Sequence, residues 1–220
     1  MTSAKSHTQP RKRRANFRLY KVGNAHHALQ DFDKHRETVC YTFGQFSLVD
    51  VIAALLDRTG PARVDICVWA VGAADLQRTK RITAGGRATR LRWVLDQGFE
   101  SRTPHYLEQM RQLYGDEQIR TIRAHAKFVL IANDEWQIVV RTSMNLNQNT
   151  RFEHLDVVDD PDLHRWHEQI VDGIFEREKA GDYSSKGMTD ITGVPETNPA
   201  TPVELGIAQT GTAATGKFGT

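Results

Sequence analysis

Apolar runs of strand length alternate along this chain with stretches of helical periodicity, and this alternation constrains the fold more than any other feature. The run 64–69, Val-Asp-Ile-Cys-Val-Trp, follows a Gly60-Pro61 break and is typical of a buried strand. The segment before it carries apolar residues at the spacing of one helical face: Leu48, Val51, Ile52, Leu55 and Leu56. Such alternation predicts an α/β domain in which helices flank a mixed β-sheet.

The remaining elements continue this pattern. Further strands are expected at 89–95, 119–123, 127–132, 136–141 and 154–158, and further helices at 73–82, 104–114 and 161–179. Residues 133–135, Asn-Asp-Glu, have the residue types of a hairpin turn, and 47–50, Ser-Leu-Val-Asp, has the pattern of a capping box that starts a helix. With no internal repeat in the sequence, we expect one domain over 17–180.

Composition changes at both ends of this domain. Residues 1–16 lack apolar periodicity and are expected to form a basic, flexible arm. Residues 181–220 are dominated by Thr, Gly, Ala, Ser and Pro, and such a segment buries too little apolar surface to offset the entropy of ordering it. We therefore expect a disordered, low-complexity tail.

Several features bear on the compartment. No apolar run approaches the ~20 residues of a membrane span, and residues 1–10 have no apolar core of a signal peptide. For the two cysteines, Cys40 and Cys67, we expect free thiols in a reducing cytoplasm, with one disulfide as the alternative. The sequence thus predicts a cytoplasmic protein without membrane contact.

Positive charge is concentrated, although the formal net charge is only +2. One basic block is Arg11-Lys12-Arg13-Arg14, and a second group has no acidic residue between its members: Arg78, Lys80, Arg81, Arg87, Arg90 and Arg92. A solvated surface explains such runs, and so does contact with a polyanion such as a nucleic-acid backbone. The residues expected to bind nucleic acid are the block 11–14 with Arg78, Lys80, Arg81, Arg87 and Arg151.

The residues that carry chemistry begin with His125 and Lys127, which are two apart in an expected strand and so predicted to share a face. A neutral imidazole can attack phosphorus or donate a proton, and an ammonium group beside it can bind a phosphoryl oxygen. Beyond the hairpin, Ser143 and Asn145 have the same spacing and can donate hydrogen bonds to phosphate. Glu153, which enters the next strand, is placed to hold the imidazole in one tautomer.

This pattern resembles the signature of the phospholipase D superfamily, His-x-Lys-x4-Asp followed a few residues later by Gly-Ser/Gly-x-Asn. Here 125–127 reads His-Ala-Lys and 142–145 reads Thr-Ser-Met-Asn, and the resemblance covers residues 41–180. Two positions depart from it: Ala132 stands where the family has Asp, with Asp134 two residues later, and Thr142 replaces Gly. The resemblance implies a phospholipase D-like mixed sheet and phosphodiester hydrolysis without metal or cofactor.

The family mechanism uses two histidines. One attacks phosphorus and forms a phosphohistidine, and the other protonates the leaving oxygen and then activates water. The resemblance implies that His125 is the nucleophile, that Lys127, Ser143 and Asn145 bind the phosphate, and that Glu153 orients His125. Because His125 alone among the nine histidines has Lys two residues later, each chain is expected to supply one half-site, completed across the two-fold axis of a homodimer.

The expected function is therefore that of a metal-independent phosphodiesterase, specifically a DNA endonuclease. Two alternatives stay open. A catalytically inert nucleic-acid-binding module with the same fold is compatible with Ala132 and Thr142. A phospholipid phosphodiesterase is the other, which the small chain and the lack of an amphipathic membrane-binding stretch disfavour.

Other conspicuous residues have simpler expectations. His164 and His167 could bind a metal, but no third ligand has fitting spacing, so an exposed helix face is expected. The tryptophans Trp69, Trp93 and Trp136 are expected in the core rather than as base-stacking platforms. Residues 44–46, Gly-Gln-Phe, can line the site or form a tight turn.

Overall fold

One β-sheet organises the structure. The computed structural model describes residues 14–20, 23–147 and 150–184, all within one unit, residues 10–195. The strands are β1 (Arg14–Tyr20), β2 (Arg36–Thr42), β3 (Ala62–Val68), β4 (Ala88–Asp96), β5 (Ile119–Ile122), β6 (Phe128–Ala132), β7 (Gln137–Thr142) and β8 (Glu153–Asp159). The helices are α1 (Ala25–Ala28), α2 (Leu48–Thr59), α3 (Ala73–Ala84), α4 (Phe99–Arg102), α5 (Pro104–Tyr114), the 3-10 turn η1 (Asp116–Gln118) and α6 (Pro161–Arg177).

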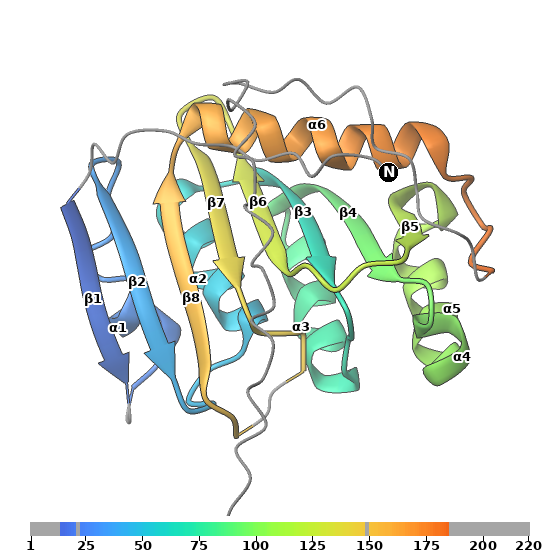
Figure 1. Ribbon diagram of the computed structural model, residues 1–220, viewed down its shortest axis with the longest axis horizontal. Coiled ribbons are helices and arrows are strands. Elements are labelled where there is room, and N and C mark those ends of the chain that lie inside the picture. Colours follow the sequence, from blue (N-terminus) through green and yellow to red (C-terminus); the bar gives the residue numbers. More distant parts are fainter. Residues whose placement is uncertain (1–13, 21–22, 148–149, 185–220) are drawn as a thin grey trace, which may run out of the picture. The chain divides into compact units, whose positions relative to one another are not determined.

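Within the described residues the strand order is β1-β2-β8-β7-β6-β3-β4-β5 (Figure 1). β3, β4 and β5 run parallel and are joined by helical crossovers, as parallel neighbours require. The β6–β7 hairpin is inserted beside β3, with β6 antiparallel to it, and β8 and β2 continue the antiparallel half. This insertion brings the start of β6 to the end of β3, far away in the sequence.

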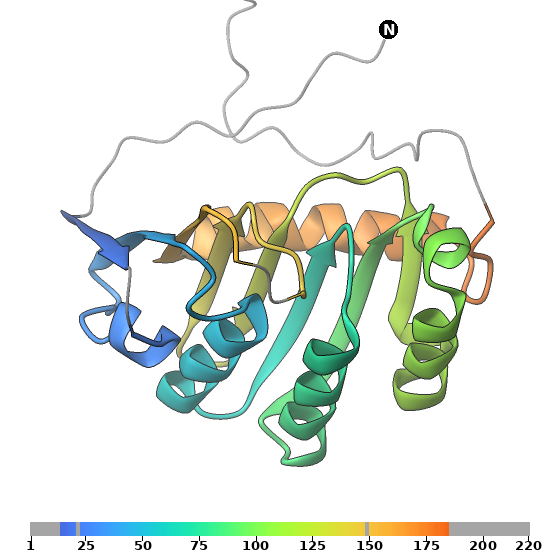
Figure 2. The same cartoon turned by 90° about the horizontal axis from the view of Figure 1, so that it is seen from below.

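Helices cover both faces of the sheet (Figures 1 and 2). α2, α3 and α5 pack on one face, and α6 lies across the other face over β5, β6 and β7. Successive residues of a strand point to opposite faces, and β3 shows this: Val64 and Ile66 pack in the larger core with α2 and α3, whereas Cys67 packs in the smaller core under α6. Burial on both faces explains why the sequence of β3 is almost continuously apolar.

The predicted α/β fold class is confirmed, and the predicted elements are present with shifts of a few residues at their ends. The helix expected at 104–114 is α5, and the expected hairpin joins β6 and β7. As the capping box predicts, the Asp50 carboxylate accepts the backbone N–H of Ser47 at 2.9 Å. Cys40 and Cys67 are both buried, and within the described residues neither forms a disulfide, as expected. The sequence pattern missed β1, β2 and the short helices α1 and α4.

Both expected ends of the domain need correction. The predicted arm, 1–16, ends too late, because β1 begins at Arg14 and pairs with β2 along its whole length; residues 1–13 lie outside the described residues. The predicted tail, 181–220, begins too early, because Tyr183 is buried and its hydroxyl donates to the Asp116 carboxylate at 2.7 Å. Residues 185–220 lie outside the described residues.

The prediction that His164 and His167 lie on an exposed face of α6 is wrong, because both are buried. The His167 ring packs against Phe128, and its Nδ1 lies 2.8 Å from the carbonyl oxygen of Leu163. In the part of the chain that the structure describes, no three His, Cys, Asp or Glu side chains are grouped to hold a metal ion. No helix in the same residues is long and apolar enough to cross a membrane.

Burial of His164 predicts a pH-dependent stability. The residue is 3% exposed, and its Nε2 has no hydrogen-bond partner among the described residues. Burial lowers the pKa of His164; Glu168, Asp65 and Asp159 oppose this effect, and Arg63 adds to it. Because the unfolded chain then binds more protons than the folded chain, the free energy of unfolding should fall as the pH drops below ~6.5.

We expect this fall to be shallower in His164→Gln, which cannot titrate, by up to about 1.4 kcal/mol per pH unit between the ordinary histidine pKa and the lowered one. Urea unfolding of the two proteins at a series of pH values measures the difference. Parallel stability curves would show that His164 takes up no extra proton on unfolding.

Candidate active site

The predicted site residues gather at one edge of the sheet, the lower edge in Figure 1. β2, β3 and β7 end at this edge, β6 and β8 begin there, and α2 and α3 start just beyond it. The register explains the arrangement: antiparallel neighbours alternate their beginnings and ends, so loops remote in the sequence meet at the same edge.

His125 and Lys127 lie in a segment without regular secondary structure before β6, so the prediction that they belong to a strand is wrong. The ladder between β3 and β6 ends at Cys67 and Phe128, and just beyond β3 the backbone amides of Trp69 and Ala70 bond to Asn145 instead. The segment is nevertheless attached to β7: Thr142 N–H donates to the Lys127 carbonyl at 3.2 Å.

The Lys127 ammonium stays close to this segment. Its Nζ donates to the His125 carbonyl at 2.9 Å, which brings the charge beside the backbone of the candidate nucleophile. Burial raises the pKa of the Cys67 thiol to about 12, and the nearby Lys127 charge opposes that rise. A positive charge is thus fixed next to His125, where a phosphate would need it.

Trp69 is the ring beside His125, and its place corrects the prediction that it belongs to the core. It is only partly buried, and its ring meets the His125 ring edge-on at 6.4 Å between centroids. The Arg102 guanidinium lies 4.1 Å over the Trp69 ring, donates to the Trp69 carbonyl and pairs with Asp96. Sequence reasoning missed both Trp69 and Arg102 as site residues.

Asn145 locks the end of β3 to the loop after β7. Its Oδ1 accepts the backbone N–H groups of Trp69 at 3.0 Å and Ala70 at 3.1 Å. The two segments then continue side by side, with Gly72 N–H donating to the Leu146 carbonyl. Because both amides occupy Oδ1, the Nδ2 group of Asn145 is the part left to donate to a phosphate.

Ser143 and Glu153 form a pair at the start of β8. The Ser143 hydroxyl donates to the Glu153 carboxylate and accepts the backbone N–H of His154. Both side chains are partly exposed. The predicted bond from Glu153 to His125 is not formed in the described part of the chain, where the contact of Glu153 is with Ser143.

A small pocket opens beside this pair. It is lined by Gly44, Phe46, Ser47, Met144, Asn145, Asn147 and Glu153. Gly44 and Phe46 therefore line this pocket, which agrees with the expectation that residues 44–46 can line the site. Ser47 is the N-cap of α2, so the positive end of that helix dipole faces the same region.

The departures from the family signature lie in different places. Ala132 is buried at the far end of β6, away from His125, and Asp134 is exposed in the hairpin turn. Asn133 holds that turn by accepting the N–H groups of residues 135 and 136. Thr142 is at the site edge, where its hydroxyl donates to the His154 carbonyl at 2.6 Å. Ala132 is therefore at the end of β6 that is remote from His125 and Lys127.

The predicted basic group is divided between the two ends of α2 and α3. Arg78 lies at the site end, in contact with Asp50 and Ser47. Arg87 bonds to Asp57 and to the Ala53 carbonyl near the other end of α2. The exposed members are Lys80, Arg81 and Arg151. Arg14 begins β1, and the prediction for Arg11, Lys12 and Arg13 lies outside the described residues.

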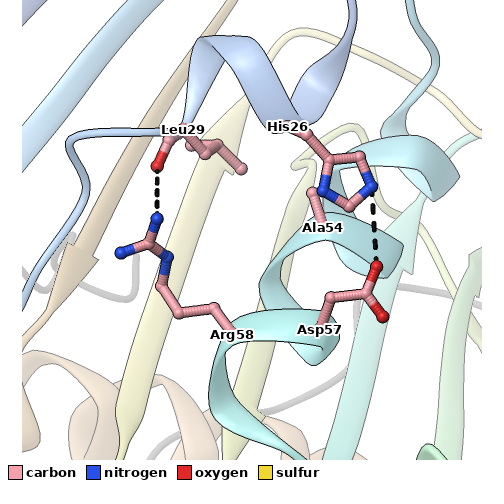
Figure 3. A pocket seen from close by; sticks show the side chains of 5 residues that line it. All are labelled: His26, Leu29, Ala54, Asp57 and Arg58. Atoms are coloured by element: carbon pink, nitrogen blue, oxygen red, sulfur yellow. Dashed lines mark hydrogen bonds and ion pairs between the residues drawn. The ribbon is translucent and has the colours of Figure 1, made fainter.

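A second pocket lies near the last turn of α2, remote from the site (Figure 3). It is lined by His26, Leu29, Ala54, Asp57 and Arg58. His26 pairs with Asp57 at 3.5 Å, and Arg58 donates to the Leu29 carbonyl at 3.1 Å. These bonds attach α1 to α2, so the polar groups here serve the fold.

Comparisons with known proteins found similarity among solved structures alone. No protein-family model and no curated protein sequence matches the chain. Among solved structures, NucT from Helicobacter pylori matches with a TM-score of 0.46 and 15% identity over 60% of this chain and 91% of that chain. Nuc from Salmonella typhimurium, described as a phospholipase D family member, matches with a TM-score of 0.50 and 17% identity over 68% of this chain and 98% of that chain.

A third match is the polyphosphate kinase from Porphyromonas gingivalis, with a TM-score of 0.51 and 13% identity, which covers 75% of this chain and 31% of that chain. The likeness to Nuc spans almost the whole of that protein, and the sheet described above is the mixed, helix-flanked sheet that the motif predicted. This chain has the fold of the phospholipase D superfamily, and the resemblance found in its sequence is confirmed at the level of the fold.

Proposed function

We propose that this protein is a metal-independent phosphodiesterase, specifically a DNA endonuclease, whose site is shared between two copies of the chain. The observation that carries the proposal is the meeting of the motif residues at one sheet edge. His125 is exposed there, Lys127 is bonded to its carbonyl, and Asn145 is held through its Oδ1, which leaves its Nδ2 group to donate. The fold shared with Nuc supports the same assignment.

The proposed reaction has two displacement steps. In the first, a nitrogen of the neutral His125 imidazole attacks phosphorus, a P–N bond forms, and the P–O bond to the leaving strand breaks. The oxygen that leaves takes a proton from the second imidazole. In the second step that imidazole removes a proton from water, the water oxygen attacks phosphorus, and the P–N bond breaks. The net change is hydrolysis of one phosphodiester by one water.

The charged and polar groups of the site suit this reaction. Lys127 and the amide of Asn145 would bind the non-bridging oxygens, because an ammonium group and an N–H donor stabilise the charge that they gain. Glu153 would act through Ser143 in one chain, since its carboxylate is bonded to that hydroxyl. A bond from Glu153 to an imidazole stays a prediction.

The second imidazole is proposed to come from a partner copy. The sequence has one His-x-Lys pair, and the exposed position of His125 supports an approach by a second copy. A two-fold axis beside His125 would place two identical imidazoles around one phosphate, and a symmetric interface is the common solution for homodimers.

DNA is proposed as the substrate because Arg151, two residues before Glu153, is an exposed cation. Lys80 and Arg81 are further exposed cations, toward the end of α3 that lies away from the site. Cytoplasmic location remains part of the proposal. The direct test is cleavage of a labelled DNA by the wild-type protein in excess chelator. Cleavage there supports the proposal; cleavage that stops when the chelator is added would overturn the metal-independent mechanism.

Mixing with an inactive variant tests the shared site. If both copies of His125 serve one phosphate, a dimer with one His125→Ala chain is inactive. Equal amounts of wild type and His125→Ala, refolded together, should then have about a quarter of the activity of the same total amount of wild-type protein. If each chain carries a complete site, about half would remain. Mixing with His26→Ala, which lies in the remote pocket, should leave activity unchanged.

A further inference from the structure

Three aromatic side chains stand out on the surface beside the candidate site. Tyr41 is 42% exposed, Phe43 37% and Phe152 60%, and they are the exposed large hydrophobic residues in the described part of the chain. All three belong to one cluster. The centroid of the Phe152 ring lies 5.3 Å from that of Tyr41, with an angle of 7° between the two ring planes, and 5.0 Å from the centroid of the Phe43 ring. We name these three residues the aromatic cluster.

The fold explains why the cluster stays open to solvent. On β2, Cys40 and Thr42 are buried, so Tyr41 points to the opposite face. That is the face of α6, but α6 packs over β5, β6 and β7 and leaves the β2–β8 side uncovered. Several exposed aromatic rings in contact with one another are unusual on a protein surface and mark an interaction site.

The aromatic cluster is attached to the phosphate-binding groups. Tyr41 pairs in register with His154, whose ring lies 6.2 Å away. The His154 backbone is bonded on both sides to Ser143, and Phe152 directly precedes Glu153, the partner of Ser143. A nucleotide with its phosphate at the site would therefore have its neighbour's base near these rings.

We propose that the aromatic cluster is a stacking subsite for an unpaired nucleobase, so that the enzyme takes single-stranded nucleic acid. Aromatic rings together with cations are the usual way to bind single strands without reading their sequence, and Arg151, the residue that precedes Phe152 in the chain, is an exposed cation. A base in a duplex has both faces stacked and cannot use such a subsite. The inference rests on the proposed function, because it assumes a phosphodiester at the site.

A second copy of the chain is the competing occupant, and the exposed area argues against it. An aromatic side chain buries about 150–250 Å², so the exposed parts of these three amount to roughly 300 Å². One side of a stable protein interface buries about 800 Å². The cluster alone is therefore too small for a stable interface between two copies of the chain.

The test compares two strands that differ only in their bases. A short labelled oligothymidylate and an abasic strand of equal length carry the same phosphates, so the ratio of their dissociation constants isolates the bases. Fluorescence anisotropy is measured in a His125→Ala background, in which the strand should survive. We expect the oligothymidylate to bind about tenfold or more tightly than the abasic strand, and Phe152→Ala to abolish that ratio.

Matched variants keep the result specific. Phe152→Trp retains a ring and should retain the ratio, and Arg151→Ala should weaken both strands equally because it removes a phosphate contact. Affinity for a duplex should not change in Phe152→Ala. Equal binding of the two strands by the parent protein would overturn the stacking subsite, and so would a change from dimer to monomer in Phe152→Ala, which would assign the rings to an interface.

The two proposals fail separately. DNA cleavage by a protein that binds both strands equally would retain the nuclease and reject the subsite. A protein that prefers bases through Phe152 but cleaves no DNA would reject the nuclease and retain the subsite as a binding site.

Discussion

Replacing His125 with alanine is expected to lower the rate of DNA cleavage by at least about 10³-fold, because removal of a covalent nucleophile leaves only binding and electrostatic assistance. The loss should appear in kcat and not in KM, because Lys127 and Asn145 would still bind the phosphate. The side chain of His125 is exposed, and among the described residues its ring contact is with Trp69. Stability should therefore change by less than about 0.5 kcal/mol.

The measurement is cleavage of a labelled DNA in excess chelator by wild type, His125→Ala and the control His26→Ala. His26 is exposed and lies at the remote pocket, where its side chain pairs with Asp57. His26→Ala should be as active as wild type. Equal activity of wild type and His125→Ala would remove His125 from the chemistry and favour a different site.

The largest expected effect on stability comes from Asp65. It is 4% exposed and bonded through both oxygens to Arg92, at 2.7 Å from Nε and 2.7 Å from the terminal nitrogen. Arg92 is 8% exposed and also bonds Asp172 on α6. Asp65→Ala removes two of the bonds of this buried guanidinium and leaves Asp172 as its remaining carboxylate partner, so we expect a cost of about 3 kcal/mol, at the low end of the range for breaking a buried pair.

The matched control removes both charges. Asp65→Leu with Arg92→Met replaces the pair with apolar side chains, which should cost much less than the single substitution and can even stabilise the fold. Urea unfolding followed by tryptophan fluorescence gives both values. A cost below about 1 kcal/mol for Asp65→Ala would show that solvent reaches Arg92, contrary to its burial.

Much of the fold could be predicted because its central strands are buried on both faces of the sheet. The run 64–69 is apolar almost throughout, and this composition marks a strand covered on both faces whatever its neighbours are. β2 is different: Thr38 and Cys40 face the core, but Tyr41 faces solvent. Its one-sided pattern over few residues is too short to distinguish a strand from a loop.

The sequence motif predicts the residue types of the candidate site but not the contacts between them. Its spacing points to His125, whereas whether Glu153 meets His125 or Ser143 depends on the register of β7 with β8. Trp69 ends an apolar run and so resembles a core residue; it faces His125 because the β3–β6 ladder stops at Cys67. These outcomes follow from pairing between distant segments, which local sequence does not encode.

The most direct test of the account is covalent trapping on His125. Wild-type protein is mixed with a labelled DNA, quenched within one turnover in alkaline denaturant, and digested for peptide mass spectrometry. If His125 is the nucleophile, we expect a nucleotide joined through phosphorus to His125, and no such adduct in His125→Ala. A label on another residue, or cleavage within that turnover without any covalent species, would contradict it.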